Sequence, residues 1–156
     1  MKKAAFAAGL LMILSLTGCI NTFNDPVMAC LPDYKSKRLC ETGGFQDYTD
    51  YNRYFYESVT EQAFTSSAYF KPVKEEDIIN ILMYIEDFEN WVEVIGKELK
   101  EQYDFDKSYV AEGDFFYIKT KYGEQIDLTP PERFYSYTLY NFDMDTQTLY
   151  YFHNNI

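Results

Sequence analysis

The sequence predicts an α+β fold in which one long helix packs on an antiparallel β-sheet. Apolar residues between about Lys74 and Gln102 recur at spacings of three and four, as in a helix. Several segments between residues 115 and 152 instead show the two-residue alternation that is typical of strands. The aromatic content of 19% suits half-buried strands, because a tyrosine ring packs while its hydroxyl stays in water. The same tyrosines would also suit a recognition face, since they supply large contact areas at low entropic cost.

The first twenty residues have the pattern of a bacterial export signal. Two lysines precede an apolar run of thirteen residues that ends at Leu16, followed by Thr17, Gly18 and Cys19. As a helix this run spans only about 20 Å, which is too short for a ~30 Å hydrocarbon core. The sequence Leu-Thr-Gly-Cys resembles the lipobox of bacterial lipoproteins, in which the cysteine is lipidated and becomes the new amino terminus.

The lipobox resemblance implies a location as well as a modification. Cys19 would carry at least a diacylglyceryl group, and two acyl chains hold a protein on a membrane without a transmembrane helix. Ile20, which follows it, is not the aspartate that retains such proteins in the inner membrane of enteric bacteria. The expected location is therefore the cell envelope, on the outer membrane facing the periplasm if the source is Gram-negative.

Length and charge divide the chain and restrict its partners. We expect a signal peptide over residues 1–18, a tether over 19–33 and a single α+β domain over 34–156. Losing Lys2 and Lys3 from the 14 basic residues leaves 12 against 25 acidic residues, a net charge of −13. Such a surface repels nucleic acid and allows a basic protein partner, although acidity also serves solubility alone.

The cysteines that remain after lipidation predict a disulfide. Cys30 and Cys40 form an even pair in an oxidising compartment, where such pairs are usually joined. A metal site would need more ligands than two cysteines and the distant His153 offer. We therefore predict a Cys30–Cys40 disulfide, no metal and no cofactor.

The middle of the chain predicts two helices, of which the second has the more regular apolar spacing. Apolar spacing over Asp50–Ala63 suits a helix, although its aromatic and β-branched residues favour a strand. A short strand is expected at 67–71, stopped by Pro72. The long helix from about Lys74 to Gln102 should bend or end near Gly96, since glycine costs about 1 kcal/mol in a helix interior. Its buried stripe comprises Ile78, Ile81, Leu82, Ile85, Phe88, Val92, Ile95 and Leu99.

The last third of the chain predicts strands. One strand covers about residues 115–122, and two more, at 134–142 and 148–152, form a hairpin through the turn at 143–147. The resulting order of one strand, a long helix and an antiparallel meander is similar to cystatin-like folds. This resemblance rests on element order alone, and such folds host many functions.

No pattern in the sequence indicates a reaction. His153, the single histidine, is expected to be a solvated residue near the carboxyl end, and the pairs Asp104/Asp106 and Asp143/Asp145 lack the further ligands of a calcium loop. We therefore expect no enzyme, but a membrane-anchored accessory lipoprotein that binds a basic envelope protein, such as an inhibitor or immunity factor. The alternatives are a lipoprotein that binds cell wall or a small molecule and, third, an envelope hydrolase.

Overall fold

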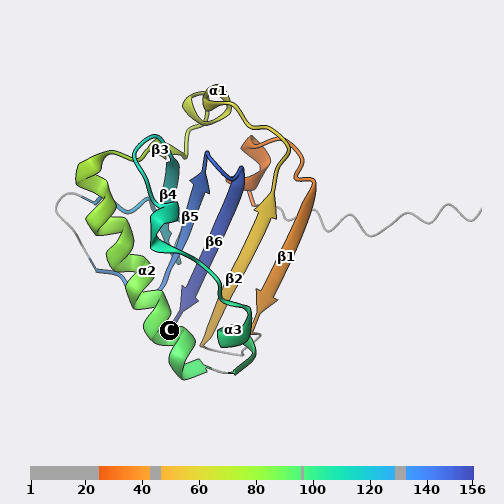
Figure 1. Cartoon of the computed structure of the whole chain (residues 1–156). Coiled ribbons are helices and arrows are strands. Elements are labelled where there is room, and N and C mark those ends of the chain that lie inside the picture. Colours follow the sequence, from red (N-terminus) through yellow and green to blue (C-terminus); the bar gives the residue numbers. More distant parts are fainter. Residues whose placement is uncertain (1–24, 43–46, 96, 129–132) are drawn as a thin grey trace, which may run out of the picture.

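The computed structural model describes residues 25–42, 47–95, 97–128 and 133–156, and it confirms the α+β class. A six-stranded antiparallel sheet carries one long helix on one face (Figure 1). The strands are β1 (Ser36–Glu41), β2 (Tyr48–Phe55), β3 (Lys71–Pro72), β4 (Phe115–Thr120), β5 (Tyr137–Asp143) and β6 (Thr148–Asn155).

The strand order is β1-β2-β6-β5-β4-β3, which places the last strand of the chain inside the sheet. β6 pairs with β2 over eight residues and with β5 through the predicted terminal hairpin. The Asp143 carboxylate closes this hairpin by accepting the backbone N–H groups of Asp145 and Thr146 at 2.9 and 3.2 Å. This turn chemistry is what the sequence at 143–147 predicts.

The predicted long helix is present as helices α2 (Glu75–Ile95) and α3 (Lys97–Gln102). The bend or end expected at Gly96 lies outside the described residues. The buried side of α2 carries the predicted apolar stripe, with Ile81, Ile85 and Phe88 completely covered. Acidic residues fill the first turn, where they interact favourably with the helix dipole.

The helix predicted at Asp50–Ala63 is wrong. Residues 50–55 of this segment belong to strand β2, and a helix forms only at α1 (Glu61–Thr65). Tyr51 and Tyr54 are both buried, but on opposite faces of the sheet, so their spacing of three does not mark one helix face. The strand predicted at 67–71 is likewise shifted to β3. Three strands therefore precede α2, instead of the single strand of the cystatin-like order.

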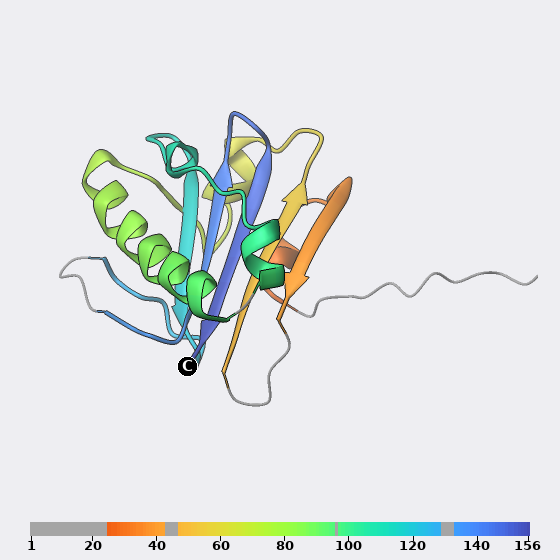
Figure 2. The same ribbon diagram turned by 60° about the horizontal axis from the view of Figure 1, so that its bottom comes forward.

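Apolar side chains are buried on both faces of the sheet. One cluster lies between the sheet and helices α2 and α3, and a second lies under α1 and the amino-terminal segment (Figure 2). Val27 and Leu31, on either side of the short 3-10 helix η1 (Met28–Cys30), belong to the second cluster. The packed domain thus includes residues assigned to the tether by the sequence, and only residues 19–24 of that tether lie outside the described residues.

The predicted Cys30–Cys40 disulfide is not formed, because the two residues lie on opposite faces of the sheet. Both are free thiols. Cys40 belongs to the cluster under α2, whereas the Cys30 thiol donates to the Val27 carbonyl at 2.9 Å on the other side. A spacing of ten residues does not reveal which face each residue occupies, and that is why the sequence prediction was wrong.

Candidate functional site

A row of polar side chains crosses five strands on the face of the sheet opposite α2. In register, Glu41 of β1 lies beside Asp50 of β2, Asp50 beside His153 of β6, His153 beside Thr138 of β5, and Thr138 beside Lys119 of β4. Register partners point to the same face, and strands lie about 4.8 Å apart, so the row is about 19 Å long. We call these five residues the polar row.

The polar row lies in a hollow of about 590 Å³, a volume within the range of small-molecule sites. Three tyrosines also line it, and two of their rings lie beside the histidine. The ring centroid of His153 is 5.0 Å from that of Tyr48 and 6.2 Å from that of Tyr151. Tyr122, at 79% exposure, is the third. The hollow therefore combines aromatic faces with donors, acceptors and charges.

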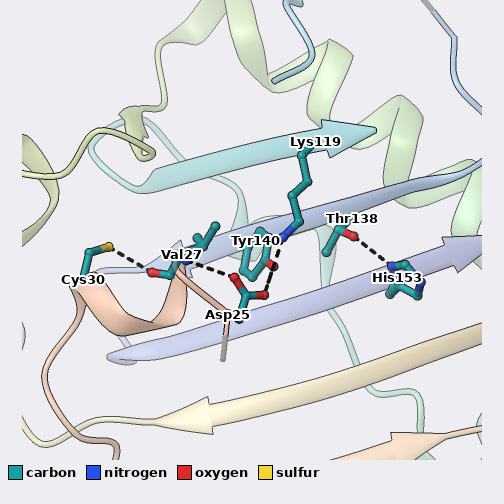
Figure 3. Close-up of polar contacts among 7 residues, drawn as sticks. All are labelled: Asp25, Val27, Cys30, Lys119, Thr138, Tyr140 and His153. Atoms are coloured by element: carbon teal, nitrogen blue, oxygen red, sulfur yellow. Dashed lines mark hydrogen bonds and ion pairs between the residues drawn. The ribbon is translucent and has the colours of Figure 1, made fainter. Parts of the chain in front are cut away.

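His153 is half-buried, which contradicts the expectation of a solvated histidine. Its Nδ1 lies 2.8 Å from the Thr138 hydroxyl oxygen, a contact drawn in Figure 3. Burial lowers the pKa of the imidazole, and the nearby Lys119 charge lowers it further. The ring is therefore neutral at pH 7, with one nitrogen able to donate and the other to accept.

Asp50 is a half-buried carboxyl of the polar row with a raised pKa. Burial raises its pKa from 3.8 to about 6; the Thr42 N–H opposes that shift, and Glu41 adds to it. The Thr42 nitrogen donates to Asp50 Oδ1 at 3.1 Å. Perturbed carboxyls in a hollow are typical of functional sites, because binding and proton transfer both use groups poised near neutral pH.

Replacing Asp50 by asparagine is expected to stabilise the domain at pH 7. The carboxyl pKa is higher in the folded than in the unfolded chain, so its ionisation destabilises the fold as pH rises from about 4 to 6. Asparagine keeps an acceptor for Thr42 and carries no charge. Allowing for solvent screening of a half-exposed group, we expect a gain of about 1 kcal/mol at pH 7 and none near pH 4 in urea melts.

The exposed Glu41 provides the control for this prediction. Glu41→Gln removes the neighbouring carboxylate of the same row and should change the free energy of unfolding by less than about 0.5 kcal/mol. An equal effect of Asp50→Asn at both pH values would contradict the assigned cause.

The amino-terminal segment is fastened beside the polar row by Asp25. The Asp25 carboxylate accepts from the Tyr140 hydroxyl and from the Val27 N–H, and it lies 3.6 Å from Lys119 Nζ (Figure 3). Lys119 Nζ also lies 5.2 Å from the centre of the Tyr140 ring. The positive charge of Lys119, at one end of the polar row, is thus paired with the negative charge of Asp25. Asp25 belongs to the segment that follows the predicted lipid anchor.

The opposite face of the molecule is the exposed side of α2, which is strongly acidic. The helix has seven acidic residues and no basic one between Glu75 and Ile95. Ile79 and Val94 lie on the same exposed side at 72% and 73% exposure. Lysines from outside α2 pair with three of the acids, in the pairs Lys74–Glu76, Lys100–Glu93 and Lys107–Glu89.

The other sequence candidates have structural roles. Asp104 follows α3 and pairs with the buried Arg53, while the Tyr51 hydroxyl donates to it at 3.0 Å. Asp106 caps the 3-10 helix η2 (Lys107–Tyr109). No group of three or more His, Cys, Asp or Glu residues within the described ranges could hold a metal ion.

The predicted lipidation site, Cys19, lies outside the described residues. Within them, no helix is long and apolar enough to cross a bilayer. Comparison with protein-family models, curated proteins and solved structures gives no match for the chain.

Proposed function

We propose that this chain is a lipid-anchored, non-catalytic accessory protein of the cell envelope that binds a basic protein through the exposed side of α2. The anchor is Cys19 of the lipobox-like sequence, on the outer membrane in a Gram-negative source. A basic hydrolase or toxin fits the partner's chemistry, which would make the chain an inhibitor or immunity factor. The observation that carries this proposal is the charge of α2, which has seven acidic residues and no basic one.

Two properties of α2 support a protein partner. Its acids attract a basic surface over long distances and raise the association rate, in the manner of electrostatic steering. Ile79 and Val94 lie fifteen residues apart, or about 22 Å along the helix, with acids between them. Each of these side chains offers a partner a separate apolar contact near one end of the acidic stretch.

A photo-crosslinking amino acid placed on α2 in living cells tests this proposal. We expect adducts with a basic protein from position 79 or 94, and none from position 122, which is exposed and lines the hollow on the other face of the sheet. High salt should reduce the adduct, because the attraction of exposed charges is screened.

A pair of matched variants separates a specific α2 contact from overall acidity. Glu75→Gln with Glu86→Gln lowers the charge on α2 and should reduce the adduct about fivefold. Glu57→Gln with Glu61→Gln removes the same charge at exposed positions outside α2 and should leave the adduct unchanged. Equal losses in both variants, or adducts with acidic proteins only, would overturn the proposal.

A further inference from the structure

We propose a second binding site, independent of the α2 surface: the hollow over the polar row binds a neutral oligosaccharide. The ligand would lie on the sheet face opposite α2, with its ring faces on the tyrosines and its hydroxyl groups on the polar row. This inference does not depend on a protein partner for α2.

The aromatic lining fits the apolar face of a sugar ring. Tyr48 of β2 and Tyr151 of β6 both lie beside His153, and Tyr122, which follows β4, adds an exposed ring with Lys121 Nζ 5.5 Å from its centre. The face of an aromatic ring is electron-rich, and the C–H groups on one face of a pyranose are slightly positive. A pyranose therefore packs on such rings while its edge stays free to form hydrogen bonds.

The polar row supplies the hydrogen bonds that the edge of a sugar needs. The carboxylates of Glu41 and Asp50 accept from hydroxyl groups, and Lys121 donates to them. His153 Nδ1 is already in contact with the Thr138 hydroxyl, which leaves Nε2 of the imidazole for a ligand. A sugar hydroxyl both donates and accepts, so it can bond to a carboxylate, to the imidazole or to an ammonium group.

The charge balance of the hollow favours a neutral ligand over an ion. Glu41 and Asp50 line the hollow with Lys119 and Lys121, and the Asp25 carboxylate lies 3.6 Å from Lys119 Nζ, so three carboxylates accompany two ammonium groups. An anionic ligand would be repelled by this small negative excess and by the acidic chain around it. A cationic ligand would meet Lys119 and Lys121 in the lining itself. A neutral, hydroxyl-rich molecule avoids both repulsions.

Calorimetric titration of the full chain tests the inference. The protein is kept in a detergent without a sugar head group, and the probes are chitotriose, maltotriose and mannotriose at millimolar concentration. We expect saturable binding of at least one probe by the wild-type chain. Tyr48→Leu and Asp50→Asn should each weaken that binding by about tenfold or more.

Tyr135→Leu is the matched control, because Tyr135 is 71% exposed and does not line the hollow. It should bind like the wild type, and thermal melts should show that all three variants remain folded. The inference is overturned if no probe binds the wild-type chain, or if Tyr48→Leu and Asp50→Asn bind as tightly as Tyr135→Leu does. Because Glu75 and Glu86 lie on the other face, their replacement should not alter sugar binding, and this keeps the two proposals distinguishable.

Discussion

Replacing Ile85 by aspartate is expected to remove a large part of the stability of the domain. Ile85 is completely buried between α2 and the sheet. The change removes an apolar side chain from the core and places a carboxylate among apolar neighbours, with an expected loss of ~3–5 kcal/mol. Since domains of this size are stable by only ~5–15 kcal/mol, urea melts should show a clearly lower midpoint.

The neighbouring residue provides the control for this variant. Glu86 lies one position further along α2 and is exposed, so Glu86→Gln should change the free energy of unfolding by about 0.5 kcal/mol or less. A wild-type midpoint for Ile85→Asp would mean that α2 does not bury this side on the sheet in solution.

Replacing Cys19 by serine is expected to release the protein from membranes. The thiol is the lipid acceptor that the lipobox-like sequence offers, and serine cannot take its place. Without acyl chains, an acidic domain has no affinity for anionic head groups, so fractionation should move the whole population into the soluble fraction.

Cys30→Ser is the matched control, because it removes a thiol from the packed domain and leaves Cys19 in place. This variant should stay with the membranes after a high-salt wash. Equal membrane association of Cys19→Ser and wild type would refute the lipid anchor.

The sequence predicts α2 well because the helix has one buried side and one wet side. Its apolar residues therefore recur with the helical period, and Ile81, Ile85 and Phe88 are identified correctly. β2 gives no such pattern, since Tyr51 and Tyr54 are buried on opposite faces. A strand covered on both sides loses its alternation, and for that reason this segment was predicted as a helix.

The polar row could not be predicted from the sequence. Its members come from five strands and are separated by up to 112 positions, between Glu41 and His153. They come together only through the sheet register, which depends on all five strands at once. The half-buried position of His153 was missed for the same reason, since its neighbour Thr138 belongs to another strand.

The central place of β6 has a consequence for how the chain reaches its folded state. In the described sheet, β2 and β5 are joined only through β6, which is the last of the six strands to leave the ribosome. Until it emerges, the earlier strands form two separate pieces, β1–β2 and β3–β4–β5, without a continuous sheet. Forming the β2–β6 pair closes a loop of about ninety residues, a slow step of high contact order. Completion of the sheet, and with it the burial of both apolar clusters, therefore waits for the last of the six strands.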